Sequence, residues 1–414
     1  MTKEFFNVTP VETVFEYIAE FSGTGTEIVD LLAAGGRILA GEIVSDIDLP
    51  GFDRSTMDGY AVRASDTFGA SEGNPAYLDI CGSIAMGEKP DITVLPGKAA
   101  RIATGGMLPE GADAVMMVEH ASEIDDMTIE VYRRVAPGTH VIQKDEDIRK
   151  NTRLLSPGTF LRPQETGIIA AMGMPRVTVY KKPVVGIIST GDELVPIERH
   201  PEAGFIRDIN TYTLASAIHL CGAVPVSCGI VEDRFDPLFA AAECALSQCD
   251  MLILSGGSSV GTRDLTVEVI EALPGAAIRV HGLPVRPGKP TILAEAGGKS
   301  IWGLPGHVAS AMVIFEIFVK PCIRHISGDR GAFDGNDFRI PAVLTRNLSS
   351  AQGRIDYVRV RTVEKGGVLF AEPVLGPSGL IRTMLDADGL IRIGMNSEGL
   401  EKGVQVMVMP FHQY

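Results

Sequence analysis

The run VVGIISTGDEL, residues 184–194, decides the fold of the central part of the chain. Its first half, Val184–Ser189, is a continuous apolar run of strand length, which is typical of a strand buried on both faces of a sheet. A helical pattern follows from Asn210, with Leu214 and Ile218 on one face. Strand and helix continue to alternate, so this segment predicts a parallel sheet with helices on both faces.

The alternation extends on the C-terminal side. The further elements predicted are the strands Val224–Ile230 and Met251–Leu254 and the helix Pro237–Ser247. A long apolar helix, Val308–His325, closes the segment, and we expect Pro321 to end or kink it early because proline lacks a backbone N–H.

The segments that flank this α/β part have a different residue pattern. Thr9, Pro10 and Glu12 predict a capping box at the start of an N-terminal helix, and a second helix is expected near Thr26–Ala34. Glycine and proline punctuate short apolar runs from Asp46 to about residue 141, which indicates a β-rich lobe. Residues 143–179, with a small helix near residues 165–172, are expected to return beside the N-terminal helices.

Short, evenly spaced strands return after about residue 338 and suggest a small barrel or sandwich. They are Ile340–Leu344, Ile355–Arg361, Val368–Pro373, Leu390–Ile393 and Val404–Met409. The predicted fold is therefore an α/β multidomain protein with four parts. These are a discontinuous N-terminal helical domain (1–45 plus 142–180), a β-rich lobe (46–141), an α/β domain (181–328) and a C-terminal β-barrel domain (329–414).

Net charge and cysteine spacing limit the classes of function that the protein can have. The 414 residues carry a net charge of −15, which argues against nucleic acid or an anionic membrane as the main partner. None of the six cysteines shows zinc-site spacing, so buried reduced thiols are expected. We find no signal peptide and no membrane-spanning apolar run, and we therefore expect a cytoplasmic protein.

Two loops follow predicted strands, where open parallel sheets bind ligands. One is Thr190–Leu194, and the other is the glycine-rich stretch from Ser255, Gly256 and Gly257 to Gly261. The second loop offers backbone amides to phosphate oxygens, although a glycine-rich turn with no ligand has the same composition.

Several carboxylates are expected on the same rim of the sheet. They are Asp192, Glu193, Asp233 and Asp264. Because unpaired carboxylates repel one another and any phosphate, a hard cation such as Mg²⁺ held by oxygen ligands would resolve the conflict. The alternative is that each carboxylate only caps a helix.

Two further turns carry candidate anion-binding groups. Arg286 and Lys289 flank a stiff Pro-Gly turn and supply fixed positive charge, although such a turn is more often a solvated loop. Pro305 and Gly306 precede the long helix, where backbone amides hold anions, and His307 beside them is more often structural than catalytic. In the β-rich lobe, residues 52–62 and 101–113 are too polar and glycine-rich for simple strands and predict shaped loops.

These stretches carry a resemblance to a known family. FDRSTMDGYAV (52–62) resembles the signature of the MoeA family, which includes the C-terminal domain of gephyrin. Five further blocks resemble the family in the same order: RIATGGMLPEGADAV (101–115), STGDEL (189–194), SGGSSVGTRD (255–264), VRPGKP (285–290) and WGLPG (302–306). The resemblance spans nearly the whole chain.

The resemblance implies a fold and a reaction. The α/β part would be the molybdopterin-binding domain, and the protein a homodimer in which the β-rich lobe of one subunit faces the α/β site of the other. The implied reaction inserts molybdate into adenylylated molybdopterin with release of AMP, with magnesium as the metal. A molybdopterin adenylyltransferase would be the partner that supplies the substrate.

The resemblance also implies residue roles. Glu193, Asp58 and Thr104 match catalytic or site-lining positions, and Asp147 resembles another site-facing carboxylate. The substrate-binding positions that match are Ser255, Gly256, Gly257, Asp233, Asp264, Arg286, Lys289 and Pro305, with Glu193, Asp233 and Asp264 as metal ligands.

One departure and three rival functions stay open. The family usually continues LPG with Asn-Pro, whereas this chain has His307-Val308, which leads to the hypothesis of an altered oxyanion pocket that prefers tungstate. The rivals are a molybdopterin adenylyltransferase, a non-enzymatic carrier or scaffold, and a CinA-like nucleotide amidohydrolase. The three regions outside the α/β domain disfavour the first, the carboxylates argue against the second, and the 52–62 block disfavours the third.

Overall fold

The computed structural model describes residues 8–256, 262–333 and 338–411. Its internal contacts divide the chain into two compact units. The larger unit consists of Met1–Gly41, Pro157–Thr166 and Pro175–Tyr414, and the smaller of Glu42–Ser156 and Gly167–Met174.

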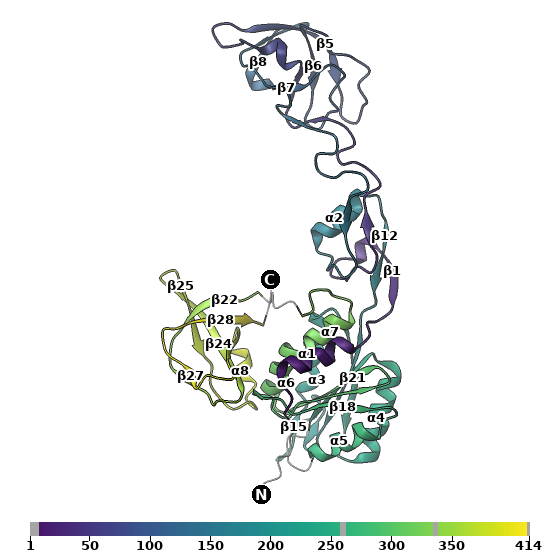
Figure 1. Cartoon of the computed structure of the whole chain (residues 1–414), viewed down its shortest axis with the longest axis vertical. Helices are drawn as coiled ribbons and strands as arrows, with labels where there is room; N and C mark the ends of the chain where they lie inside the picture. The colour runs from purple at the N-terminus through teal and green to yellow at the C-terminus, as the bar shows by residue number, and fades with distance from the viewer. Residues whose placement is uncertain (1–7, 257–261, 334–337, 412–414) are drawn as a thin grey trace. The chain divides into compact units, whose positions relative to one another are not determined.

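The larger unit is built on a six-stranded sheet in the order β16-β13-β17-β21-β20-β18 (Figure 1). The strands are β13 (Val184–Thr190), β16 (Val224–Val231), β17 (Met251–Gly256), β18 (Ala277–His281), β20 (Ile292–Ala296) and β21 (Lys299–Leu304). The first four strands in the order pair in parallel, as predicted, whereas β20 and β18 pair antiparallel. Gly297 and Gly298 join β20 to β21, and both have positive φ, which suits the two-residue turn of an antiparallel hairpin.

Helices cover both faces of this sheet. α1 (Val11–Glu20), α3 (Asn210–Leu220), α6 (Val308–Ile314) and α7 (Lys320–Ile326) share one apolar core with Ile187 and Trp302. α4 (Phe235–Gln248) and α5 (Thr262–Ala272) share the other core with Ile188. Adjacent residues of β13 thus point to opposite cores, as the alternation of side chains along a strand requires.

The predicted long apolar helix is present but irregular. A π-helical turn, Phe315–Val319, lies between α6 and α7, and helical structure continues to Ile326. Pro321 therefore does not end the helix. A proline lacks the amide that an α-helix needs at that point, and the wider turn just before it is a common accommodation.

Two N-terminal predictions are wrong. α1 begins at Val11 with Pro10, not Thr9, as its N-cap, and it has no side-chain cap. The Thr9 backbone N–H, which a capping box would pair with Glu12, donates to Gly282 O at 3.1 Å. The expected helix near residues 26–34 is β1 (Thr26–Asp30) followed by a short 3-10 turn, Leu31–Ala33. β1 pairs antiparallel with β12 (Arg176–Tyr180), a tertiary pairing that overrides the local helical pattern. The helix expected near residues 165–172 is present as α2 (Pro163–Ala171).

The C-terminal part is a closed barrel. β24 (Ile355–Lys365), β25 (Val368–Pro373), β22 (Ile340–Leu344), β28 (Gln405–Pro410) and β26 (Gly389–Ile393) pair in this order, and β26 pairs back with β24. All five predicted strands are therefore confirmed, and of the two alternatives the barrel is correct. β19 (Val285–Arg286) adds to the start of β24, β23 (Leu348–Ser349) pairs with β27 (Gly399–Leu400), and α8 (Arg382–Leu385) lies before β26.

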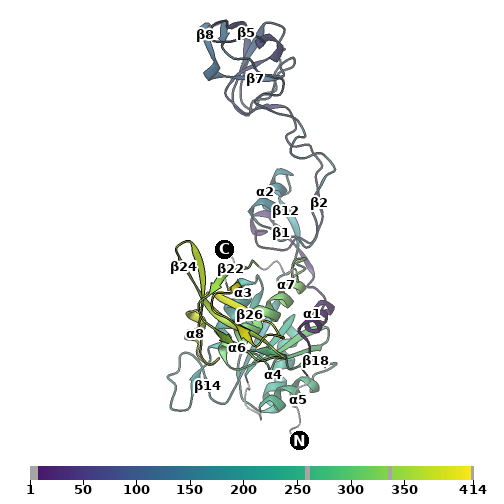
Figure 2. The same cartoon turned by 60° about the vertical axis from the view of Figure 1, so that its left-hand side comes forward.

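The smaller unit contains a six-stranded sheet in the order β7-β4-β6-β5-β9-β8 (Figure 2). The strands are β4 (Gly59–Val62), β5 (Ala76–Ile84), β6 (Lys98–Ile102), β7 (Ala114–Met117), β8 (Ala121–Asp125) and β9 (Thr128–Val131). Gly59 is required where β4 meets β7, because a Cβ there would lie 1.9 Å from Met116 O.

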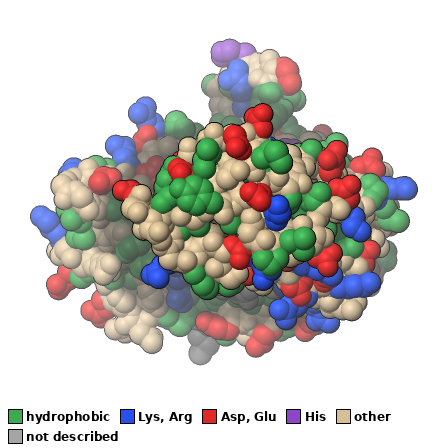
Figure 3. All heavy atoms as spheres, turned by 90° about the horizontal axis from the view of Figure 1, so that it is seen from above, with side chains coloured by type: hydrophobic (Ala, Val, Ile, Leu, Met, Phe, Trp, Pro, Cys, Tyr) green, Lys and Arg blue, Asp and Glu red, His purple; other side chains and the backbone are tan. Residues whose placement is uncertain are grey.

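On the face shown in Figure 3, acidic, basic and apolar side chains are interspersed, and no continuous basic patch is visible.

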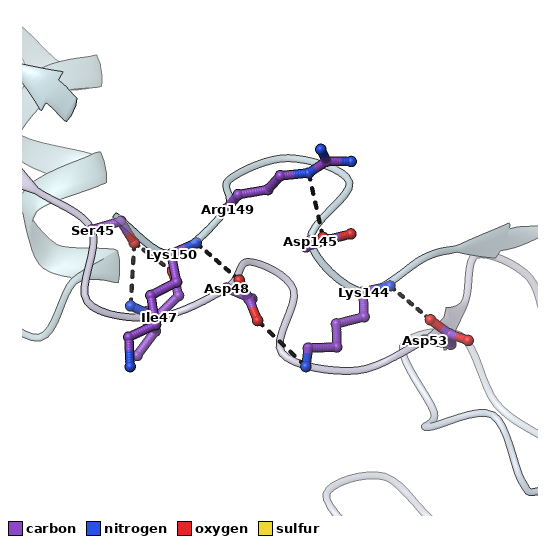
Figure 4. A network of polar contacts seen from close by, with 8 residues as sticks. All are labelled: Ser45, Ile47, Asp48, Asp53, Lys144, Asp145, Arg149 and Lys150. Atoms are coloured by element: carbon purple, nitrogen blue, oxygen red, sulfur yellow. Dashed lines mark hydrogen bonds and ion pairs between the residues drawn. The ribbon is translucent and has the colours of Figure 1, made fainter. Parts of the chain in front are cut away.

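Two chain segments, residues 42–55 and 141–156, lie side by side in the smaller unit. They pair through β2 (Ile43–Val44) with β11 (Arg153–Leu155) and β3 (Arg54–Ser55) with β10 (Val141–Ile142). Between these pairs, Asp48 accepts from Lys150 N at 2.9 Å and lies 3.4 Å from Lys144 Nζ, and Lys144 N donates to Asp53 at 2.7 Å (Figure 4). The backbone hydrogen bond from Lys150 leads the causes that lower the pKa of Asp48.

None of the described helices is long and apolar enough to cross a membrane.

Candidate active site

The carboxyl ends of three parallel strands bring the predicted loops together in the larger unit. Thr190 at the end of β13 is paired with Gly256 at the end of β17, and Ser255 is paired with Leu304 at the end of β21. The loop that carries Glu193, the start of the glycine-rich loop and the Pro305-Gly306 turn therefore begin at one edge of the sheet. This is the edge where ligands bind in open parallel sheets.

Two carboxylates at this edge hold the strand ends in place and do not cap helices. Asp233 follows β16 and accepts a short hydrogen bond from the Thr190 hydroxyl. Its own backbone N–H donates to Asp192 Oδ1 at 3.1 Å. α4, the next helix, begins without a side-chain cap, so capping does not account for Asp233.

Glu193 lies in the loop after β13 with an exposed side chain. The backbone shapes this loop: Leu194 N donates to Gly191 O at 3.0 Å, and Ile206 N donates to Glu193 O at 2.9 Å. A Cβ at Gly191 would lie 2.8 Å from Glu193 Oε2, so glycine leaves room for the carboxylate. Glu193 is thus presented by a fixed backbone while its carboxylate stays open to a ligand.

The start of the glycine-rich loop is tightly packed. Ser255 is buried, and a Cβ at Gly256 would lie 2.1 Å from Thr190 O. Gly256 lines a small cavity of about 10 Å³ together with Pro290 and Pro305. Three segments far apart in sequence therefore meet at this point. Gly257 lies outside the described residues, as does the side chain of Asp264.

The basic turn is anchored on the barrel and on the long helix. Arg286, in β19, pairs with Asp356 of β24, and its Nη1 lies 3.8 Å from the buried Asp356 carboxylate. Gly288 has φ +113°, and a Cβ there would lie 2.4 Å from Ile314 Cδ1. The side chains of Arg286 and Lys289 are both exposed, so the turn presents two cations from a rigid base.

A buried polar cluster beneath the site was missed by the sequence analysis. Asp208 accepts from Ser189 Oγ and from Thr211 N, both at 3.1 Å, and Asn210 donates to Ser255 Oγ at 2.9 Å. The available signal was the polar start of the predicted helix at Asn210. Its residues resemble ordinary capping residues, and only the tertiary structure places them against β13 and β17.

The smaller unit also brings together its two predicted loops, residues 52–62 and 101–113. Backbone hydrogen bonds join them at Ser55 and Gly106, with Ser55 N donating to Gly106 O at 2.9 Å. Asp58 Oδ1 accepts from Thr104 N at 2.7 Å and from Thr104 Oγ1 at 3.0 Å. These bonds lower the pKa of Asp58, the backbone bond contributing most. The resulting exposed carboxylate is charged and held in one orientation.

Asp147 lies in the paired segments of the same unit. Its backbone N–H donates to Leu49 O at 3.1 Å, and its side chain is exposed.

Thr104→Val provides a direct test of this arrangement. The variant loses the hydroxyl donor but keeps the amide, so we expect the pKa of Asp58 to rise toward 3.8 without reaching it. The depressed pKa stabilises the folded state above the ordinary carboxyl pKa, and this contribution is lost as the pH falls through the folded value. Carboxyl NMR titration measures the shift, and an unchanged pKa would contradict the assignment.

Among the described residues, no group of three or more histidine, cysteine, aspartate or glutamate side chains is arranged to hold a metal ion.

Comparison with known proteins finds family matches along most of the chain. Residues 9–173 match the MoeA N-terminal region (domain I and II), residues 186–325 match a probable molybdopterin binding domain, and residues 341–411 match the MoeA C-terminal region (domain IV). The chain belongs to the MoeA family.

Relatives within the MoeA family cover the chain almost end to end. A molybdopterin molybdenumtransferase of Bacillus subtilis is 35% identical over 97% of this chain and 93% of its own length. One from Haemophilus influenzae is 32% identical over 94% and 95%. A crystal structure of a molybdopterin biosynthesis MoeA protein from Pyrococcus horikoshii superposes with a TM-score of 0.81 at 37% identity, covering 99% of this chain and all of that one.

His307, singled out above from the sequence, has a defined environment in the structure. It is the N-cap residue of α6, and its Nδ1 lies 2.9 Å from Ser378 Oγ in the loop between β25 and α8. Ala309 N also donates to Ser378 O at 3.0 Å. The start of α6 is thus linked to the barrel by both side chain and backbone.

Proposed function

We propose that this protein is a molybdopterin molybdotransferase, which inserts molybdate into adenylylated molybdopterin and releases AMP. The observation that supports this most is that the Glu193 loop, the Ser255-Gly256 strand end and the Pro305 turn begin at one edge of the sheet, where Asp233 is bonded to Thr190. Pro290, the residue after Lys289, lines a small cavity with Gly256, so the basic turn lies near the strand end that is proposed to hold phosphate. Relatives named molybdopterin molybdenumtransferase match over nearly their whole length.

The proposed chemistry consists mainly of positioning and charge compensation. Ser255 and Gly256 would hold the diphosphate by hydroxyl and amide donors, with Gly257 continuing that loop. Arg286 and Lys289 would compensate the charge of the oxyanion, and Pro305 would shape the wall between them. Glu193 is proposed as the catalytic carboxylate at the reacting phosphate.

Mg²⁺ is proposed as the metal. Glu193, Asp233 and Asp264 would hold it together with diphosphate oxygens, since hard cations prefer oxygen ligands and protein carboxylates commonly share Mg²⁺ with phosphate. The bound ion would polarise the phosphate to be cleaved. Asp58, Thr104 and Asp147 of the smaller unit are proposed as further site residues, the role that the resemblance to the MoeA family implies for them.

The decisive assay follows AMP after the purified protein is mixed with adenylylated molybdopterin, Mg²⁺ and molybdate. We expect AMP release that needs both the oxyanion and the metal, and that stops when EDTA is added. Formation of adenylylated molybdopterin from ATP and molybdopterin would instead indicate an adenylyltransferase. The absence of turnover under both conditions would refute the proposal.

We also propose that the protein forms a homodimer, and that a groove in the larger unit takes part in it. The groove has a volume of about 1260 Å³ and is lined by α3, α8 and the helical run 308–326. Leu220 and Leu385 line it and are 72% and 83% exposed. Large apolar side chains this exposed are typical of surfaces that another protein covers.

The Leu220→Asp, Leu385→Asp double variant tests the dimer. We expect light scattering to give twice the 44.2 kDa chain mass for the native protein and the single-chain mass for the variant, because two buried charges oppose association. Leu375→Asp is a matched control, since Leu375 is 52% exposed but does not line the groove. A double variant that stays dimeric would exclude this groove as the interface.

Tungstate preference is the finer alternative, and His307 is the residue to test. The His307→Asn, Val308→Pro variant replaces the imidazole beside Ser378 and removes a backbone donor at the start of α6. We expect the ratio of molybdate to tungstate affinity to change in competition binding. Identical ratios in the native and variant proteins would eliminate a role for His307-Val308 in choosing the oxyanion.

A further inference from the structure

Asn210 is a buried side chain that joins two strand ends. It is the first residue of α3 and is 8% exposed. Its amide nitrogen donates to Ser255 Oγ at 2.9 Å and to Gly306 O at 2.8 Å. The chain neighbours of these two acceptors, Gly256 and Pro305, line the same small cavity. One side chain therefore connects the end of β17 to the turn after β21, next to residues that meet at the proposed site.

The two acceptors fix the orientation of the Asn210 amide. Rotating it by 180° would place Oδ1 against the Gly306 carbonyl oxygen, which can only accept. The amide keeps its orientation although the buried Oδ1 then has no donor among the residues that the structure describes. The helix also holds the base of the side chain in place, because Leu214 and Ile218 of α3 are fully buried in the core beneath β13. Asn210 is thus a rigid connection in which both amide hydrogens are used.

The bond from Asn210 sets the direction of the peptide group between Gly306 and His307. This peptide is trans, so its N–H points opposite to its C=O. Because the Gly306 oxygen points to the buried amide, the His307 N–H points away from it. Among the described residues, none accepts a hydrogen bond from that N–H, and His307 is exposed. The turn therefore keeps a backbone donor available to a ligand.

Resting on the proposed function, we infer that Asn210 is a positioning residue for the diphosphate of the substrate. It touches no substrate itself, since its buried amide donates only within the protein. It holds the Ser255-Gly256 strand end and the turn with the His307 amide at one spacing and in one orientation. Donors that are fixed before the ligand arrives bind it more tightly, because less conformational freedom is lost on binding. Loss of the Asn210 side chain should therefore weaken diphosphate binding and leave the chemical step unchanged.

Asn210→Ala tests this positioning in the molybdate assay and by calorimetry with ADP and Mg²⁺, since ADP carries an adenosine and a diphosphate as the substrate does. We expect KM for adenylylated molybdopterin and Kd for ADP to rise about tenfold, the scale of one or two hydrogen bonds. We expect kcat to stay within about twofold of the native value, because an interaction made equally in the ground and transition states changes KM alone. Asn210→Ser serves if the alanine variant does not fold, since one hydroxyl cannot donate to two acceptors.

Ile218→Val is the matched control for a general loss of stability. Ile218 is fully buried in the same helix, about two turns after Asn210, and removal of one methyl group from a buried side chain lowers stability. We expect this variant to unfold at a lower urea concentration than the native protein but to keep the native KM and ADP affinity. If Asn210 served stability alone, its variants would behave in the same way.

Three results would overturn the inference. They are native KM and ADP affinity in the folded Asn210 variants, an equal loss of affinity in Ile218→Val, and a loss of kcat with unchanged KM, which would place the effect on the chemical step. Each of them leaves the proposed function standing, because the native protein still releases AMP. A native protein that releases no AMP in the molybdate assay would refute the proposed function, and the inference with it.

Discussion

Glu193→Ala is expected to fold normally and to lower kcat for AMP release by about 100-fold or more, the range that a positioned acid–base group contributes. The fold should be kept because backbone hydrogen bonds from Leu194 and Ile206 shape the loop, while the exposed carboxylate contributes little to it. Single-turnover measurement of AMP reports the loss of activity, and circular dichroism on the same sample reports whether the fold is kept. Glu193→Gln should lose activity similarly, because the amide keeps the shape but not the charge.

Glu198→Ala is the matched control for Glu193. Glu198 lies a few residues further along the same exposed segment, outside the proposed site. We expect its variant to retain native kcat. Normal turnover by Glu193→Ala would exclude this carboxylate from the chemistry, and an equal loss in both variants would show that the effect is one of general charge.

Gly256→Ala is expected to have the largest combined effect on binding and stability. The new Cβ would lie 2.1 Å from Thr190 O and 2.5 Å from Thr190 Cγ2, so the ends of β13 and β17 must separate. Such overpacking costs about 1–3 kcal/mol. Because Thr190 also holds Asp233, the displacement should spread to that carboxylate. Urea unfolding should show the loss of stability, and calorimetry should show that AMP affinity falls by more than about tenfold, since each 1.4 kcal/mol is a factor of ten.

Gly394→Ala controls for the general effect of adding a methyl group to a glycine. Apart from Gly394 and its two chain neighbours, no heavy atom of the described residues lies within 4 Å of a Cβ built at Gly394, which lies in the barrel outside the proposed site. We expect unchanged AMP affinity and stability within a few tenths of a kcal/mol. A Gly256→Ala protein that binds AMP as the native protein does would show that the strand end is not the phosphate site.

Local pattern predicted both the continuously buried strands and the short strands that turn residues separate. Val184–Ser189 and Met251–Leu254 are strands because continuous apolar runs suit the middle of a parallel sheet. The five barrel strands were equally legible, since apolar and turn residues alternate regularly there. The same reasoning failed at residues 26–34, where the antiparallel pairing of β1 with β12 decides the structure. A pattern read within nine residues cannot show that the segment will pair with a strand far along the chain.

The sequence by itself determined the order of strands and helices, the closing barrel strands and the motifs that mark the MoeA family. Only the tertiary structure decided that Asp233 binds Thr190, that Gly256 lies with Pro290 and Pro305, and that the buried Asn210 Oδ1 has no hydrogen-bond donor among the described residues. The physical reason is that periodicity reports burial along one segment. Hydrogen-bond partners and steric limits at a site depend on which strand ends the sheet brings together, and those ends lie tens of residues apart.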